Sequence, residues 1–405
     1  MPSALPERGN NSVGHADPGA PPARSGDPAR YGIAVDLGTT SVSLALARMA
    51  PGADPQVLAT VDARNAQAVD FGRDILSRLS GALAGHGERL RDLAQRQVIE
   101  LLAQASAQAG LELQAVATAT GQVVIAGNSA MAALLVGADV STLATAPFAP
   151  VRDLRCAAGP LAELFGPARL MILEPLDAFV GGDVRADLIT AGLMAGSDQP
   201  RLLIDLGTNA EIVLAQSQQL FVCSAPAGPA FEGGGFKLTG SQILADVAEL
   251  LRHGVLGTDG KLDDQNPRVR RDQSGVAFVT GPQSGQALSQ RYLRELQLAK
   301  AATATALTRV LAAAGCQPTA VARVDIAGAF GSALAADDLV TLGLIPHSWR
   351  DRTRSLGNAS LAGALAVLGG ASPTLSPDLT LTPVDLPNDP AFNAALIAAT
   401  DLTWV

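Results

Sequence analysis

The sequence predicts an α/β protein made of two related lobes with a cleft between them. Two repeated segments carry this prediction. The tetrapeptide Asp-Leu-Gly-Thr occurs at residues 36–39 and again at residues 205–208, each time between two apolar, strand-like segments. The tripeptide Ile-Ala-Gly occurs at residues 125–127 and 326–328, each time before a helical pattern. Because both halves carry these segments in the same order, the chain is predicted to be a duplication whose ligand binds in the cleft between the halves.

Each Asp-Leu-Gly-Thr segment has the composition of a phosphate-binding turn. The largely apolar residues 31–35 and 201–204 predict buried strands, and an aspartate ends each of them. The glycine permits a tight reversal and lets a phosphate approach the backbone N–H groups. We call residues 36–40 the first phosphate loop and residues 205–209 the second phosphate loop. The predicted phosphate-binding residues are Gly38, Thr39, Thr40, Gly207, Thr208 and Asn209.

The two aspartates predict a magnesium site. A carboxylate is a hard oxygen ligand that suits Mg²⁺, held through water while the metal bridges phosphates. Asp36 and Asp205 are therefore the candidate metal ligands and catalytic residues, and two such loops facing each other would clamp one triphosphate. A single copy is equally consistent with an ordinary β-hairpin turn, but two copies with matching flanks favour phosphate binding.

Composition narrows the class of protein. The chain has 405 residues, of which 48% are hydrophobic, so it can bury two cores. No apolar segment approaches the roughly 20 residues of a membrane span. The net charge of −9 disfavours nucleic acid as a partner, because nucleic acid needs a basic face. An anionic nucleotide must then be held locally by amides, helix ends and metal.

The cysteines predict neither a disulfide nor a metal cluster. Cys156, Cys223 and Cys316 lie far apart in the sequence and form no CxxC pair. An iron–sulfur cluster usually needs four closely organised thiolates, so no iron–sulfur cluster is expected within this chain. Buried, unreactive thiols in a reducing compartment are the better interpretation.

The ends of the chain differ in composition from its middle. Residues 1–30 are rich in Pro, Gly, Ala and Arg without an apolar core, which predicts a disordered leader and a cytoplasmic location. Residues 31–195 are predicted to form the first lobe and residues 196–369 the second. Residues 370–405 then provide a linker, a C-terminal strand and a short helix.

Eight stretches of the sequence resemble one known family. They are GRDILSRL (72–79), AGNSAMAALLVG (126–137), FVGGD (179–183), IDLGTNAEIV (204–213), GPAFEGG (228–234), LQLAKAA (296–302), IAGAFG (326–331) and LGLIPHSWRDRTRSLGNASLAGAL (342–365). The chain resembles the actin-like, sugar-kinase-like ATPase superfamily, which has a two-lobed, ribonuclease H-like fold. Within it, the chain is similar to the ATPase domain of the reductive activators of corrinoid proteins.

That resemblance implies a function. Such proteins couple ATP use to the reduction of an inactive Co(II) corrinoid to Co(I) on the corrinoid protein of a methyltransferase system. The ferredoxin-like domain common in this family has no counterpart among these cysteines, so the electrons are expected from a separate low-potential donor such as a ferredoxin. ATP and Mg²⁺ are the implied cofactors. The oligomeric state stays open, with a homodimer among the options.

The resemblance also suggests further site residues. Asp183 and Glu174 precede the second phosphate loop, where the superfamily places an acid that orients the attacking water. Asp183 is favoured, and a surface or helix-capping acid is the alternative for either residue. Glu232 is a candidate for the ribose hydroxyls or merely a helix cap, and Lys300 is a nucleotide contact or a solvated helix residue. The remaining candidate nucleotide-binding residues are Gly228, Gly328, Ala329, Phe330 and Gly331.

Two other functions are compatible with the same residues. A small-molecule kinase of the superfamily would transfer the phosphate to an acid or a polyol, although no separate substrate-binding pattern is present. A nucleotide-binding regulatory or scaffold protein would bind without productive hydrolysis. Fold analogy alone does not decide between these chemistries.

Overall fold

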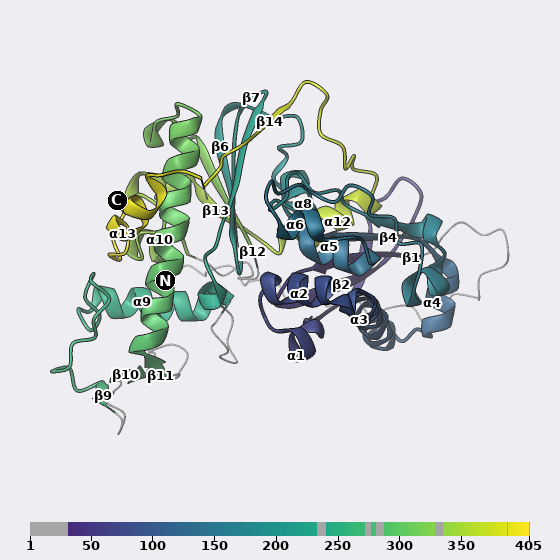
Figure 1. Cartoon of the computed structure of the whole chain (residues 1–405), viewed down its shortest axis with the longest axis horizontal. Helices are drawn as coiled ribbons and strands as arrows, with labels where there is room; N and C mark the ends of the chain where they lie inside the picture. The colour runs from purple at the N-terminus through teal and green to yellow at the C-terminus, as the bar shows by residue number, and fades with distance from the viewer. Residues whose placement is uncertain are drawn as a thin grey trace, which may run out of the picture.

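Two mixed β-sheets form the two halves of the molecule (Figure 1). The computed structural model describes residues 31–232, 240–271, 277–280, 287–328, 335–386 and 388–404. The predicted leader, residues 1–30, lies outside this described part. None of the helices in these ranges is both long enough and apolar enough to cross a membrane.

The first sheet has the strand order β3-β2-β1-β4-β5. Its strands are β1 (Tyr31–Leu37), β2 (Ser41–Arg48), β3 (Gln56–Arg64), β4 (Thr120–Gly127) and β5 (Leu170–Ile172). Strands β1, β2 and β3 pair antiparallel, whereas β4 and β5 run parallel to β1. Helices α3 (Gly87–Gln108) and α5 (Ser129–Val136) pack together on one face, and α3 buries Leu90, Ala94, Val98 and Leu101 at helical spacing.

The second sheet repeats this arrangement in the order β13-β12-β6-β7-β8-β14. Its strands are β6 (Ser197–Leu206), β7 (Ala210–Ser217), β8 (Gln219–Ala225), β12 (Arg323–Gly328), β13 (Thr353–Gly357) and β14 (Thr380–Pro383). Strands β6, β7, β8, β12 and β13 correspond to β1, β2, β3, β4 and β5 in order and direction. Strand β14 adds a sixth, parallel to β8. Helices α9 (Gly240–Arg252) and α10 (Gln290–Ala313) contribute to its core.

The duplication extends to single residue pairs. In the first sheet, Asp36 and Leu37 lie opposite Ala126 and Gly127 on β4. In the second sheet, Asp205 and Leu206 lie opposite Ala327 and Gly328 on β12. Each phosphate loop therefore leaves its sheet beside the end of an Ile-Ala-Gly strand, because the carboxyl ends of parallel strands meet at one edge. The predicted two-lobed α/β fold with duplicated lobes is confirmed.

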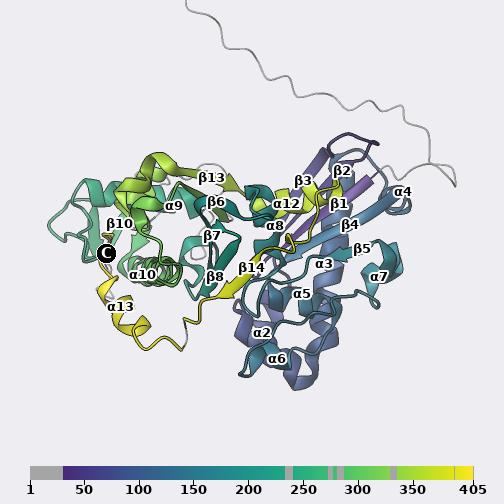
Figure 2. The ribbon, with the colours of Figure 1, turned by 90° about the horizontal axis from the view of Figure 1, so that it is seen from above.

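Two helices lie between the sheets, as Figure 2 shows from above. They are α8 (Gly182–Ala191) and α12 (Ala359–Leu368). Ala186 and Ala364 pack with residues of the first sheet, whereas Val184 and Ala359 pack with residues of the second. The helix backbones are in contact, because a Cβ on Gly363 would lie 2.0 Å from the carbonyl oxygen of Ala186. Helix α12 thus packs against β1 and β4, although it comes late in the sequence.

The remaining elements surround these two sheets. A small three-stranded sheet has the order β11-β10-β9. Its strands are β9 (Val269–Arg271), β10 (Ala277–Thr280) and β11 (Ala287–Ser289). The shorter helices are α1 (Gln67–Phe71), α2 (Ile75–Gly81), α4 (Leu113–Ala119), α6 (Ser141–Ala144), α7 (Pro160–Phe165), α11 (Ala336–Thr341) and α13 (Phe392–Ala398). A π-helical turn (Ala82–His86) joins α2 to α3, and 3₁₀ turns occur at Pro167–Arg169, Pro229–Glu232, Pro318–Ala320 and His347–Arg352.

Candidate functional site

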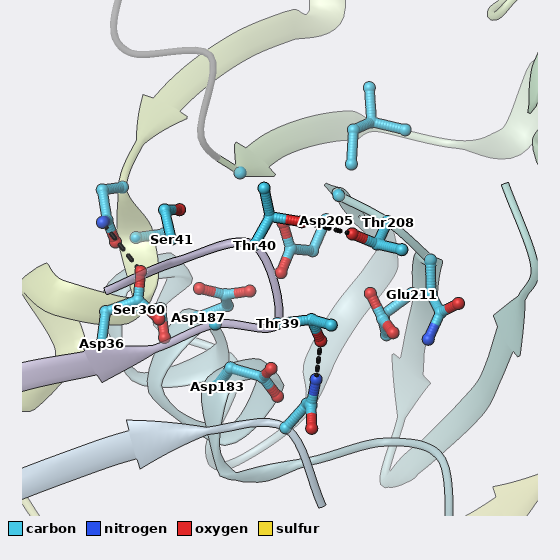
Figure 3. Close-up of a pocket in the computed structure, with 18 residues that line it drawn as sticks. Asp36, Thr39, Thr40, Ser41, Asp183, Asp187, Asp205, Thr208, Glu211 and Ser360 are labelled. Carbon is cyan, nitrogen blue, oxygen red and sulfur yellow. Dashed lines mark hydrogen bonds between the residues drawn. The ribbon is translucent and has the colours of Figure 1, made fainter. Parts of the chain in front are cut away.

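A cavity between the lobes is lined by both phosphate loops (Figure 3). Helices α8 and α12 contribute side chains to it, and β12 contributes its last residue, Gly328. The predicted site residues that line it are Asp36, Gly38, Thr39, Thr40, Asp183, Asp205, Gly207, Thr208, Asn209 and Gly328. The structure therefore gathers in one place residues that the sequence separates by almost the whole length of the chain.

Hydrogen bonds from Asn65 and Arg78 to backbone carbonyl oxygens hold the first phosphate loop in place. Asn65 Nδ2 donates to the Gly38 oxygen at 2.8 Å, and Arg78 Nη2 donates to the Thr39 oxygen at 2.7 Å. The backbone N–H of Asn65 donates to the Thr40 oxygen at 2.9 Å. Because C=O and N–H point in opposite directions in a trans peptide, the N–H groups that follow these carbonyls point away from Asn65 and Arg78. Such a row of amides suits an anion such as phosphate.

Among the residues that hold the first phosphate loop, Arg78 is unusual because it is a buried arginine. Its side chain is fully buried, and it lies in the GRDILSRL stretch of helix α2. Burial lowers the pKa of Arg78 to about 10. Its Nε donates to the Gly72 oxygen at 3.2 Å, so the guanidinium ties α2 to the first phosphate loop.

The second phosphate loop is closed by backbone hydrogen bonds and touches the first. The N–H of Gly228 donates to the carbonyl oxygen of Thr208 at 2.7 Å. The predicted site residue Gly228 therefore contacts the second phosphate loop through its backbone. Across the cleft, the hydroxyl oxygens of Thr40 and Thr208 are 3.1 Å apart. Gly328 has a φ of 121°, and a Cβ there would lie 2.3 Å from the carbonyl oxygen of Leu206. Only glycine lets β12 end this close to the second phosphate loop.

Two helix-capping asparagines hold side chains of the first phosphate loop. Asn128 caps α5 through its oxygen and donates from Nδ2 to Thr39 Oγ1 at 2.6 Å. Asn358 caps α12 in the same way and donates from Nδ2 to Asp36 Oδ2 at 2.9 Å. Each asparagine follows a glycine at the end of a strand. Each therefore fixes a helix start and a loop side chain at once.

Five carboxyl groups line the cavity, namely those of Asp36, Asp183, Asp187, Asp205 and Glu211. Among the described residues that line it, none is a lysine or an arginine. Burial, together with the charges of Asp205 and Asp36, raises the pKa of Asp183 to about 8. Burial and Asp205 also raise the pKa values of Asp187 and Glu211 well above their usual range. The cavity thus has strong negative potential and would attract a cation.

The residues present fit a hydrated magnesium ion that also binds a nucleotide. Within the described ranges, no three His, Cys, Asp or Glu side chains converge on a ready-made metal site. A metal held here would need water and phosphate oxygens to complete its shell, which is how Mg²⁺ usually binds in nucleotide sites. Both oxygens of Asp187 and the hydroxyl of Ser360 are buried at the cavity without a hydrogen-bond partner among the described residues. These polar atoms would find partners in a hydrated ligand.

Some predicted site residues lie elsewhere. Glu174 is exposed and does not line the cavity; its backbone oxygen accepts from Arg185. Lys300 is buried in α10, away from the cavity lining, and donates to carbonyl oxygens near the C-terminal end. Glu232 ends a 3₁₀ turn, and its side chain lies outside the described part. Residues Ala329, Phe330 and Gly331 also lie outside the described residues.

Other cavity residues were not predicted from the sequence, although signals for them existed. Asp187 follows Asp183 by four residues on one helix, so both can face the same way. Glu211 lies directly opposite Asp205 in the β6–β7 ladder. Asn128 and Asn358 both occupy the position between a strand-ending glycine and a helix.

The three cysteines are free and buried. Burial raises the pKa of each thiol, and that of Cys156 reaches about 11. Such thiols remain protonated at neutral pH and are poor nucleophiles and poor metal ligands.

Duplicated lobes, paired phosphate loops and an acidic cavity between them define an actin-like ATPase fold. The family description "RACo middle region" matches residues 31–195. The description "C-terminal domain of RACo the ASKHA domain" matches residues 199–238 and 236–402. The chain belongs to the RACo family, which confirms the resemblance seen in the sequence.

Proteins of known function and structure agree with this assignment. The chain is 28% identical over 417 residues to the corrinoid activation enzyme RamQ of Eubacterium limosum, covering 89% of this chain and 68% of that protein. It is 28% identical over 249 residues to the Co(II) methylated amine-specific corrinoid protein reductase of Methanosarcina barkeri, covering 58% of this chain and 41% of that protein. The solved structure of a reductive activator for corrinoid, iron-sulfur protein superposes with a TM-score of 0.80 at 27% identity, covering 93% of this chain and 67% of that one.

Proposed function

We propose that this protein uses ATP to drive the reductive activation of a corrinoid protein of a methyltransferase system. Membership of the RACo family and the relatives' activities on corrinoid proteins support this role. The single observation that carries it is the acidic cavity between two lobes, lined by both phosphate loops. One electron passes from a separate low-potential donor, such as a reduced ferredoxin, to Co(II), which becomes Co(I). We expect this reaction in the cytoplasm.

The residues of the cavity divide the task of binding Mg²⁺-ATP. Asp36 and Asp205 would hold the metal through water, since each ends a central strand at the cavity. The amides and threonine hydroxyls of the phosphate loops would bind the phosphate oxygens. Bound Mg²⁺ would neutralise phosphate charge, which lowers the barrier to phosphoryl transfer to water. Asp183, in the first turn of α8 and in the cavity lining, is the acid that we propose orients that water.

Helices α8 and α12 offer a physical route from ATP to the corrinoid partner. Both helices carry cavity residues, and together they pack against both sheets. A nucleotide that binds one arrangement of the lobes more tightly than another would shift their equilibrium through these helices. The arrangement favoured by ATP would then bind the partner so that the transfer of an electron to Co(II) becomes favourable.

Nucleotide binding is the first test, because it needs no partner. Wild-type protein should bind Mg²⁺-ATP and hydrolyse it, measured by calorimetry and phosphate release. Asp205→Asn should weaken Mg²⁺-dependent binding by at least about tenfold, because it removes a metal-binding charge. Asp198→Asn changes an exposed acid on the same strand β6 and should behave as wild type. Equal losses in both variants would contradict the assigned role of Asp205.

Reduction of the corrinoid is the second test. The full chain is mixed with a corrinoid protein in the Co(II) state and a reduced low-potential donor, and the corrinoid absorbance reports Co(I). ATP should increase the yield of Co(I), while Asp205→Asn should not. If ATP brings no gain over the donor alone with several corrinoid proteins, the proposal fails. Phosphorylation of an added acid or polyol would instead favour a small-molecule kinase.

A further inference from the structure

Asp187 is a buried carboxyl group for which the described residues supply no compensating charge. It lies one turn after Asp183 on α8, and its relative exposure is 1%. Neither of its oxygens accepts a hydrogen bond from an amide, hydroxyl or cationic donor among the described residues, and the side chain within hydrogen-bond reach is another acid, Asp205. Its charged neighbours are the acids Asp205, Asp183 and Asp36, and its burial together with their charges raises the pKa of Asp187 well above its usual range. In Figure 3 its carboxyl group is drawn among the side chains of Asp36, Asp183 and Asp205.

Other carboxyl groups of the cavity have donors. Asn358 donates to Asp36 at 2.9 Å, and Ser224 Oγ donates to Glu211 at 3.0 Å. The backbone N–H of Val184 donates to Asp183 Oδ1 at 2.8 Å. Asp187 therefore differs from these three acids, because no such donor reaches either of its oxygens within the described residues.

Asp325 shows how the same chain treats a buried carboxylate that has only a structural role. Asp325 on β12 is fully buried and forms ion pairs with three arginines. Arg201 and Arg323 approach it at 2.9 and 3.0 Å, and Arg354 also contacts it. An unpaired buried charge is far costlier than this arrangement, so the charge of Asp187 needs a partner from outside the described part of the chain.

We propose that Asp187 binds the hydration shell of the divalent cation that accompanies the nucleotide, as a third acidic residue beside Asp36 and Asp205. A hydrated cation supplies both missing features, since its charge balances the carboxylate and its water molecules donate to both oxygens. The lack of a ready-made site of three converging ligands among the described residues agrees with contact through water. This inference rests on the proposed nucleotide-binding function.

The test measures metal binding directly. Mn²⁺ serves as the probe, with the non-hydrolysable analogue AMPPNP present, and bound metal is measured by electron paramagnetic resonance. Asp187→Asn should lower Mn²⁺ affinity about tenfold, the usual effect of losing a partner of the metal's water shell. With EDTA present, the affinity of the variant for AMPPNP should equal or exceed that of wild type, because one negative charge is gone. Asp198→Asn, the exposed control on β6, should leave every value unchanged.

Thermal unfolding separates this role from a structural one. Asp187→Asn should raise the melting temperature of the metal-free protein at neutral pH, because the amide avoids the cost of burying a charge or of binding a proton at a carboxyl whose pKa is raised by burial. Mn²⁺ affinity within twofold of wild type, or a lower melting temperature, would overturn the inference and leave the proposed function intact. Wild-type protein that binds no AMPPNP with Mn²⁺ would overturn both.

Discussion

Lys300 provides a sharp test, because the sequence and the structure suggest different roles for it. The sequence makes it a candidate nucleotide contact, whereas its Nζ donates to the carbonyl oxygens of Ala399, Asp401 and Thr403 at 3.0, 2.8 and 2.5 Å. Gln297, one turn earlier on α10, donates to the Thr400 oxygen at 3.0 Å. These bonds fasten the C-terminal segment over α10. We therefore predict that Lys300→Met lowers stability and leaves nucleotide affinity unchanged.

The size of the effect follows from the groups left without partners. A buried carbonyl that loses its donor costs about 1–3 kcal/mol, so about 9 kcal/mol is the upper bound for three carbonyls, of which only that of Ala399 is in a fully buried hydrogen bond. Removing the buried ammonium returns several kcal/mol of desolvation free energy. The net loss in the free energy of unfolding should be about 2–4 kcal/mol, which corresponds to a melting temperature lower by about 5–10 °C for a lobe of this size.

Thermal unfolding and calorimetry with Mg²⁺-ATP measure the two quantities separately. Lys261→Met is the matched control, because the side chain of Lys261 is 71% exposed and forms a surface ion pair with Asp259. That variant should change stability by less than about 0.5 kcal/mol. If Lys300→Met retains wild-type stability but loses nucleotide affinity, the structural explanation is refuted and the nucleotide contact regains support.

Two further predictions concern the first phosphate loop and the cysteines. Arg78→Met should weaken ATP binding about tenfold by calorimetry, since the Thr39 carbonyl loses a charged donor and the loop loses its anchor. Arg73→Met changes an exposed residue of the same stretch and should leave ATP binding unchanged. Equal losses of ATP affinity in both variants would contradict the role of Arg78 in anchoring the loop. All three cysteines should resist DTNB until the protein unfolds, because burial raises thiol pKa values, that of Cys156 to about 11. Rapid labelling of the folded protein would contradict this.

The duplicated architecture was predictable because it is encoded locally and twice. A strand, a glycine turn and a second strand are set by residue order and by the conformational freedom of glycine, so each phosphate loop can be recognised without its partner. The register that places Asp36 and Leu37 beside Ala126 and Gly127 then recurs for Asp205 and Leu206. The acids at the strand ends consequently meet at one cavity, as their position in the pattern indicated.

Residues whose roles depend on distant partners were harder to predict. Lys300 looks like one more polar residue of an amphipathic helix, and only the chain passing about 100 residues later makes it a buried donor. Asp187 shares the helical spacing of Asp183, but spacing does not reveal that its described charged neighbours are all acids. Asn358 follows a strand-ending glycine, yet its contact with Asp36 requires α12 to lie against the first sheet.

The sequence by itself determined the two lobes, the two phosphate loops and the family, because these follow from repeated local patterns of apolar residues and glycine. Only the tertiary structure decided which charges are compensated. It surrounds Asp325 with three arginines and leaves Asp187 facing other acids in the cavity. The physical reason is that the free energy of a charge depends on everything packed around it in space, and the order of residues along the chain does not record those neighbours.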